Sequence, residues 1–307
     1  MQLSSLLGID KKDVGRIGGG KNKPTGLIDV AMVQSLDVDQ GVDDRIAEYG
    51  FVIVDECHHV SAFSFEKVLT QARARYVLGL TATPYRRDGH QPIIHMQCGP
   101  VCHQIKQKDF SSHLSGSFVY VRKTGFSFEW DDSSKIHDIW SKLIDDDERN
   151  QMIIDDIVKV LDEGRFPLIL TERREHLEKL SRLLKDKVDF IALLYGGLKK
   201  KSTQEIFDRL KQSQDANKTV ILATGSYIGE GFDEPRLDTL FLTMPSSFKG
   251  KIVQYAGRLH RYHKDKRDVR IYDYVDNNVP VLAKMFQKRL KTYKMLGYST
   301  EGISLPP

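Results

Sequence analysis

Two adjacent carboxylates, Asp55 and Glu56, directly follow the apolar run Phe51 to Val54. Such a run predicts a buried strand, and open parallel sheets bind their ligands at the carboxyl ends of strands. One carboxylate can hold a hydrated Mg²⁺ against phosphates while its neighbour orients or deprotonates the attacking water. The pair therefore suits phosphoryl transfer, with a simple cap on the strand end as the structural alternative.

Two further segments also follow predicted strands. In Leu80-Thr81-Ala82-Thr83-Pro84, short hydroxyl side chains can bond to carboxylates or to backbone, although a strand-end turn explains them equally well. The segment from Ala223 to Asp233 is rich in glycine, which lets backbone approach a phosphate or ribose closely. Neither segment is specific by itself.

Two arginines, Arg258 and Arg261, lie three positions apart on one side of a predicted helix. The fixed fork of arginine matches a γ-phosphate, and an arginine that stabilises the developing charge there raises the rate by ~10³ or more. A structural salt bridge is the alternative.

Strands and helices alternate on both sides of a looser central region. In the first part we predict strands at Leu27 to Val33, Phe51 to Val54 and Tyr76 to Leu80, with helices near Val42 to Glu48 and Phe65 to Ala74. Fully apolar strands fit a parallel sheet that is covered on both faces. In the second part we predict strands at Pro167 to Thr171, Phe190 to Leu194, Thr219 to Ala223, Thr239 to Met244 and Arg270 to Val275.

The central region, Gln91 to Glu148, contains a possible pair of strands at Ser117 to Val121 and Phe126 to Trp130. Its acidic end, Asp145 to Glu148, should cap a helix that includes Asn150. The tail from Val279 to Tyr298 has apolar residues at helical spacing. We expect the opposite face to be solvated, with a nucleic-acid or partner surface as the alternative; it carries Lys284, Lys288, Arg289, Lys291 and Lys294.

Together and in this order, four segments resemble motifs of superfamily 2 helicases. They are the DECH form of motif II at Asp55 to His58, motif III at Thr81 to Thr83, motif V at Gly229 to Asp233, and motif VI at Gln254 to Arg261. Weaker likenesses, at Val30 to Leu36, Leu170 to Arg173 and Leu194 to Gly197, extend the resemblance over nearly the whole chain. Within the superfamily the chain looks most similar to the branch of restriction-enzyme R subunits and the excision-repair helicase.

This resemblance implies an α/β protein with two RecA-like parallel-sheet domains, the first of them incomplete at its N-terminus. ATP with Mg²⁺ would bind in the cleft between them, and nucleic acid would cross both. The implied segments are a partial first domain at 1–108, a connection at 109–148, a second domain at 149–277, and a basic amphipathic helix and tail at 278–307.

The resemblance also implies a role for each matched residue. Asp55 would bind Mg²⁺ through water, Glu56 would be the catalytic base, and Arg258 and Arg261 would clamp the γ-phosphate. The remaining roles are coupling for His58, Thr81, Thr83 and Gln254, nucleotide binding for Gly231 and Asp233, and nucleic-acid binding for Gln34, Thr171, Gly197 and Thr224.

A helicase of this kind also needs a glycine-rich phosphate loop that ends in Gly-Lys-Thr or Gly-Lys-Ser and opens a helix. The segment Gly15 to Lys21 has the spacing, but Asn22 replaces the hydroxyl residue, and Pro24 and Gly26 oppose a helix. We therefore expect a turn without this function. The chain alone should then bind ATP poorly, need an upstream domain or subunit that carries the loop, and expose a sheet edge or apolar surface.

Bulk properties add little. A net charge of +4 restricts nucleic-acid binding to local basic patches, and three scattered cysteines indicate a reducing cytoplasm rather than a disulfide scaffold. No apolar run approaches the ~20 residues that a membrane helix needs.

The sequence thus predicts the core of an ATP-dependent helicase or translocase that acts on DNA rather than RNA. The alternative is a non-catalytic nucleic-acid-binding or regulatory module with a helicase-like fold. A third possibility makes Lys21 a genuine phosphate ligand. The cluster His95, Cys98, Cys102 and His103 could bind zinc, although we prefer a turn around Gly99 and Pro100.

Overall fold

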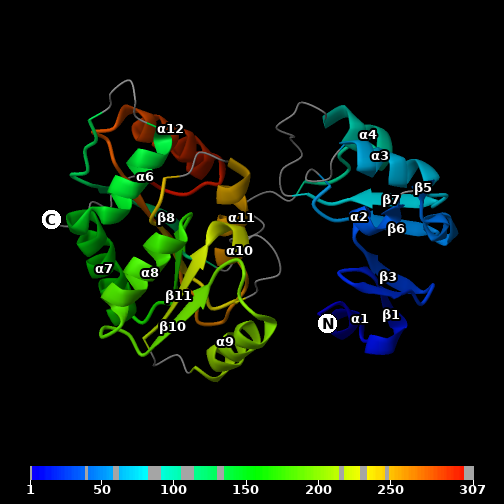
Figure 1. The fold of residues 1–307 in the computed structure, drawn as a ribbon, viewed down its shortest axis with the longest axis horizontal. Coiled ribbons are helices and arrows are strands. Elements are labelled where there is room, and N and C mark those ends of the chain that lie inside the picture. The colour runs from blue at the N-terminus through cyan, green and yellow to red at the C-terminus, as the bar shows by residue number, and fades with distance from the viewer. Residues whose placement is uncertain are drawn as a thin grey trace. The chain divides into compact units, whose positions relative to one another are not determined.

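The computed structural model divides the chain into two compact units, Met1–Gln104 and Ile105–Pro307 (Figure 1). It describes residues 2–38, 41–57, 62–81, 91–104, 114–129, 135–213, 218–228, 234–245 and 249–300. Within the described residues, no helix has the length and apolar character that crossing a membrane would require.

The described part of the first unit contains three small sheets. Its elements are α1 (Gln2–Leu7), η1 (Lys11–Asp13), β1 (Val14–Gly18), β2 (Lys21–Lys23), β3 (Ile28–Ala31), α2 (Val33–Leu36), β4 (Asp37–Val38), β5 (Gly41–Val42), η2 (Asp44–Glu48), β6 (Phe51–Val54), α3 (Ala62–Gln71), β7 (Tyr76–Gly79) and α4 (Gln91–Cys98). Strands β6 and β7 pair in parallel, as predicted. The strand predicted at Leu27 to Val33 exists as β3, but it pairs with β1 in a separate sheet.

The two faces of the β6–β7 pair differ in burial. On one face Val54 packs against Phe65 and Leu69 of α3 and Ile94 of α4. The other face, which we call the open apolar face, carries Phe51, Ile53, Tyr76 and Leu78, with exposures of 53%, 56%, 58% and 43%. The prediction that β6 is covered on both faces is therefore wrong, because strand side chains alternate and these helices cover one side.

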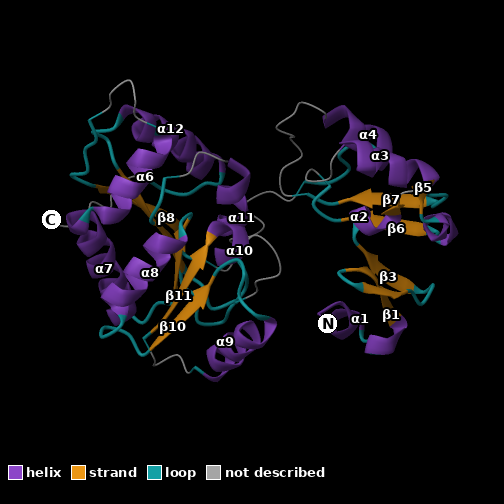
Figure 2. Cartoon of the chain, viewed as in Figure 1, coloured by secondary structure: helices purple, strands orange, loops and turns teal. Residues whose placement is uncertain are grey.

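The second unit is built around one parallel sheet with the strand order β10-β11-β9-β12-β13-β8 in the described residues (Figure 2). Its strands are β8 (Ser117–Lys123), β9 (Pro167–Thr171), β10 (Phe190–Leu194), β11 (Thr219–Thr224), β12 (Thr239–Leu242) and β13 (Val269–Val275). Its helices are α6 (Ile136–Asp145), α7 (Asp147–Asp162), α8 (Arg174–Leu184), α9 (Lys200–Gln212), α10 (Gly225–Ile228), α11 (Lys249–Leu259) and α12 (Pro280–Met295).

Helices cover both faces of this sheet, which makes the unit a doubly wound α/β domain. Helices α7 and α8 pack on one face through residues such as Ile157 and Leu180. Helices α9, α11 and α12 pack on the other through Leu210, Ile252 and Tyr293. The predicted α/β class is confirmed, and the five strands predicted after residue 166 are all present.

The central region contributes to the second sheet. The strand predicted at Ser117 to Val121 is β8, and it pairs in parallel with β13. Residues 126–129 form no strand; Phe126 instead is buried in an apolar cluster with Ile139 and Leu143 of α6. The acidic run behaves as predicted, since the Asp146 carboxylate caps α7 by accepting a hydrogen bond of 2.7 Å from the Arg149 backbone amide.

The tail helix is α12, and one of its basic residues is buried rather than solvated. Arg289 is 2% exposed, and its Nε and Nη2 donate to the Asp273 carboxylate of β13, both at 2.8 Å. The Tyr293 hydroxyl donates to the same carboxylate at 2.7 Å. The expectation that Arg289 belongs to a solvated face is wrong, because its charge is matched inside the unit by Asp273.

Candidate nucleotide and nucleic-acid site

In the first unit, the acidic pair lies at the carboxyl end of β6 beside the end of β7. The Leu80 amide donates to the Val54 carbonyl at 2.8 Å, and the Cys57 amide donates back to the Leu80 carbonyl at 3.0 Å. These bonds hold the turn that contains Asp55 and Glu56 against the residue that precedes Thr81. The structure thus brings Asp55 and Glu56 close to Thr81, with Asp55 exposed and Glu56 partly buried.

Glu56 has an uncommon backbone conformation. Its φ is +46°, and among the described residues it is the one residue other than glycine whose φ is positive. The left-handed region crowds a Cβ, so such residues are rare outside turns and sites where the conformation serves a function. The Asp55 carboxylate stabilises the turn by accepting a hydrogen bond of 2.9 Å from the Glu56 amide.

In the second unit, α11 carries Gln254 and Arg258 four positions apart, and therefore on the same face of the helix. The helix ends at Leu259, so Arg261 lies in a bend beyond it. The prediction that one helix presents both arginines is wrong for Arg261. Its position depends on the loop that follows α11.

The start of α11 is tied to the ends of β9 and β11. Lys251 forms an ion pair of 3.0 Å with Glu172, which follows β9. A Cβ at Gly225, just after β11, would lie 2.4 Å from the Tyr255 hydroxyl oxygen and 2.9 Å from Glu172 Oε1, so a larger residue there would require these side chains to shift. The sequence prediction assigned no individual role to Gly225, Tyr255 or Lys251; for Gly225, a glycine directly after a strand was the available signal.

The four residues expected along a nucleic-acid path differ in exposure. Gln34 is exposed, and Gly197 lies in a turn with φ of +91° and open space where a Cβ would be. Thr171 and Thr224 are only 2% and 8% exposed. Direct contact with a nucleic acid is therefore limited to the small part of each threonine that remains exposed.

Thr171 belongs to a buried hydrogen-bond chain through His176. The His176 Nε2–H donates to Asn150 Oδ1 at 3.0 Å, because the Asn150 amide nitrogen donates to the Ile144 carbonyl. His176 Nδ1 then accepts from the Thr171 hydroxyl at 3.1 Å. Burial and the nearby Arg149 charge lower the pKa of His176 to about 3, so this imidazole stays neutral in the folded protein.

Acidification should therefore destabilise the protein through His176. Its pKa is about 6.5 unfolded and about 3 folded, so its stabilisation is complete above pH 6.5 and is lost as the pH falls toward 3. The His176→Gln protein should be less stable than the unsubstituted protein at pH 7. The difference between their unfolding free energies should become smaller on acidification, by up to about 1.4 kcal/mol per pH unit. Urea denaturation of both proteins between pH 7 and pH 4 measures this difference. A difference that stays constant with pH would contradict the lowered pKa of His176.

The glycine-rich segment near the N-terminus forms a hairpin. Strands β1 and β2 pair antiparallel, and Gly18, Gly19 and Gly20 turn the chain with φ of +120°, +61° and +75°. Lys21 begins β2 rather than a helix. The predicted turn without phosphate-loop geometry is confirmed, because that loop requires a helix that starts at its lysine.

Four of the predicted site residues lie outside the described residues: His58, Thr83, Gly231 and Asp233. Of the zinc candidates, His95 and Cys98 lie on α4, and the predicted turn follows the helix at Gly99, where φ is +80°. In the part of the chain that the structure covers, no group of three His, Cys, Asp or Glu side chains has the arrangement of a metal site.

Two family models match this chain, each within one unit. The model described as type III restriction enzyme, res subunit, matches residues 3–86, and the helicase conserved C-terminal domain matches residues 150–263. Both matched ranges contain motifs that were identified from the sequence, the acidic pair in the first and the arginines in the second.

Two viral relatives match both units. The helicase candidate 161L of Invertebrate iridescent virus 6 is 28% identical over 284 residues, which is 88% of this chain and 61% of the relative. The ATP-dependent RNA helicase candidate L396 of Acanthamoeba polyphaga mimivirus is 28% identical over 282 residues, or 89% of this chain and 52% of the relative. This chain therefore spans only about half to three-fifths of these relatives.

The fold is also found in a solved structure, S. cerevisiae Dbp5 bound to RNA and ADP BeF3. The similarity covers 96% of this chain and 71% of that one, with a TM-score of 0.60 and 11% sequence identity. At this identity the match concerns the fold alone, and it agrees with RecA-like α/β domains.

Proposed function

The chain belongs to the superfamily 2 helicases, and we propose that its full-length protein hydrolyses ATP to move along nucleic acid. The observation that carries this proposal is the acidic pair at the end of β6, with Glu56 in a left-handed conformation beside the end of β7. We divide the chain as the motifs suggest, at 1–108, 109–148, 149–277 and 278–307. The cytoplasm is the compartment that fits three free cysteines.

The acidic pair has the chemistry that MgATP requires. Carboxylate oxygens are the ligands that Mg²⁺ prefers, and Mg²⁺ usually keeps several waters, so the exposed Asp55 suits a contact through water. When bound, Mg²⁺ neutralises phosphate charge. The partly buried Glu56 is proposed to accept the proton of the attacking water.

The second unit is proposed to supply positive charge. Arg258 and Arg261 stabilise charge that develops on the γ-phosphate. We assign nucleotide contacts to Gly231 and Asp233, coupling of hydrolysis to movement to His58, Thr81, Thr83 and Gln254, and nucleic-acid contacts to Gln34, Thr171, Gly197 and Thr224.

Double-stranded DNA is the proposed substrate, because the first unit matches a restriction-enzyme subunit. The test is ATP hydrolysis by the natural full-length protein without nucleic acid and with duplex DNA, single-stranded DNA or RNA. We expect duplex DNA to stimulate hydrolysis, and DNA affinity to fall as salt rises. Stimulation by RNA alone would change the substrate to RNA, as the name of L396 suggests for that relative. Salt-sensitive binding without hydrolysis would instead identify a non-catalytic nucleic-acid-binding module.

A further inference from the structure

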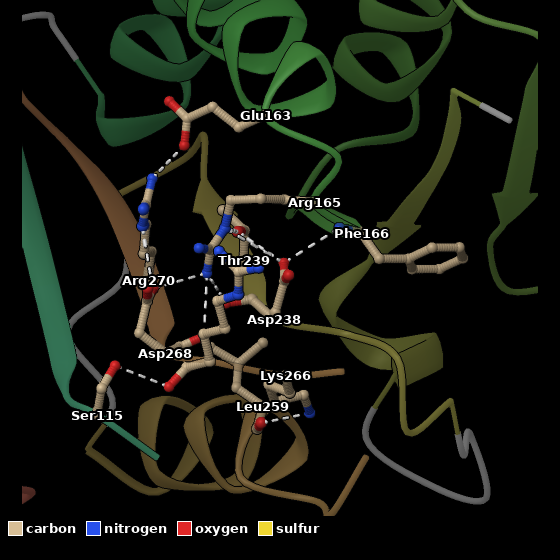
Figure 3. A network of polar contacts seen from close by, with 11 residues as sticks. Ser115, Glu163, Arg165, Phe166, Asp238, Thr239, Leu259, Lys266, Asp268 and Arg270 are labelled. Carbon is tan, nitrogen blue, oxygen red and sulfur yellow. Dashed lines mark hydrogen bonds and ion pairs between the residues drawn. The ribbon is translucent and has the colours of Figure 1, made fainter. Parts of the chain in front are cut away.

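A buried lysine lies at the end of the helix that carries the site arginine Arg258. Lys266 is 7% exposed, and its Nζ donates to the Leu259 carbonyl at 2.8 Å and to the Arg261 carbonyl at 2.8 Å. Figure 3 shows the bond to Leu259. One ammonium group thus joins the last residue of α11 to the arginine that follows the helix.

The Leu259 carbonyl has a particular need for a donor. The last four carbonyls of a helix lack partners within it, and positive charge is favourable at that end. Leu259 is fully buried in the core of the second unit, so its carbonyl is a fixed point. Arg261 lies past the helix and is exposed, and the lysine links its backbone carbonyl to that fixed point.

Lys266 is itself held in place from two sides. Its own amide donates to the His263 carbonyl at 3.2 Å, which closes the loop after α11. Burial lowers the pKa of Lys266 to about 8; the negative charges of Asp238 and Glu234 oppose this shift, and the positive charges of Arg165 and Arg261 add to it. Lys266 therefore remains mostly protonated at pH 7.

Asp238 is rigidly placed. Its carboxylate accepts hydrogen bonds from the Phe166 amide at 3.1 Å and the Thr239 hydroxyl at 2.9 Å, and it lies 3.5 Å from Arg165 Nε (Figure 3). Because Phe166 directly precedes β9 and Thr239 is the first residue of β12, the Asp238 carboxylate is anchored to the sheet.

We propose that Lys266 is a positioning residue that holds Arg261 ready to act on the γ-phosphate, by bridging the Leu259 and Arg261 carbonyls. This inference rests on the function proposed above. A small displacement of a catalytic group can lower the rate by about 10²-fold, so the bridge has a measurable consequence.

The experiment uses nucleic-acid-stimulated ATP hydrolysis by the natural full-length protein. Lys266→Met keeps most of the apolar stem and removes the donor. We expect kcat to fall by about tenfold to 100-fold with little change in KM, because Arg261 acts on charge that develops in the transition state. Lys264→Met, an exposed position in the same loop, should keep the normal rate.

A double-mutant cycle separates positioning from a general structural role. In an Arg261→Ala background, measured with radiolabelled ATP, Lys266→Met should cause no further loss, because its partner in catalysis is already absent. The inference is overturned if the loss is the same in both backgrounds or if Lys266→Met has normal kcat. If Lys266→Met does not fold by circular dichroism, Lys266→Ala, which also removes the donor but leaves room for water beside the two carbonyls, is judged by the same two criteria.

The cycle also distinguishes this inference from the proposed function. If Arg261→Ala hydrolyses ATP at the normal rate, the proposed role of Arg261 fails and the inference falls with it. If Arg261→Ala is inactive while Lys266→Met is normal, only the inference is wrong.

Discussion

Replacing Arg261 with alanine in the full-length protein will lower nucleic-acid-stimulated ATP hydrolysis by about 10³-fold or more. The guanidinium is proposed to act where charge develops on the γ-phosphate, so its loss should appear mainly in kcat. Steady-state kinetics over a range of ATP concentrations measures the effect.

Arg267→Ala is the matched control for this substitution. Arg267 is exposed and lies six positions further on, and its backbone carbonyl accepts from Ser115 without involvement of its side chain. It should keep normal activity. Equal losses in the two variants would indicate a general effect of positive charge in this region and would remove Arg261 from the catalytic machinery.

Glu56→Gln will lower the same activity by about 10²-fold to 10⁴-fold, which is the usual contribution of a general base. The amide keeps the size of the side chain but cannot take a proton from water. The substitution should leave ATP binding intact. A fluorescent ATP analogue should therefore bind the Glu56→Gln protein and the unsubstituted protein with equal affinity, although the Glu56→Gln protein no longer hydrolyses ATP efficiently.

The matched control for Glu56 is Glu66→Gln, the same substitution at an exposed position of α3 in the same unit. A Glu56→Gln protein that hydrolyses ATP as fast as the Glu66→Gln protein would exclude the proposed base. Asp55 and Glu56 would then only cap the end of β6, without a role in catalysis.

The central strands of the second sheet could be predicted from sequence because they are buried on both faces. Pro167–Thr171 and Thr219–Thr224 are buried along their whole length, so each reads as a continuous apolar or β-branched run. The sheet to which β3 belongs was harder to predict, because an apolar run indicates a strand but does not indicate the partner with which that strand pairs. Its partner β1 contains two glycines and an arginine and gives no strand signal of its own.

The parts of the site that sequence could not place depend on distant partners. Periodicity continues through Arg261, but α11 stops at Leu259, where Lys266 satisfies the end of the helix from seven positions away. Arg289 looks like the lysines around it until Asp273 on β13 is known to lie beside it. Local patterns do not contain this information.

The open apolar face of β6 and β7 should affect how the protein behaves in concentrated salt solutions. Sulfate and similar salts are excluded from protein surfaces and strengthen the association of apolar groups. With Phe51 and Ile53 each more than half exposed, molecules should come together through this face during ammonium sulfate steps. Buffers of chloride salts at modest protein concentration therefore suit preparation and storage better.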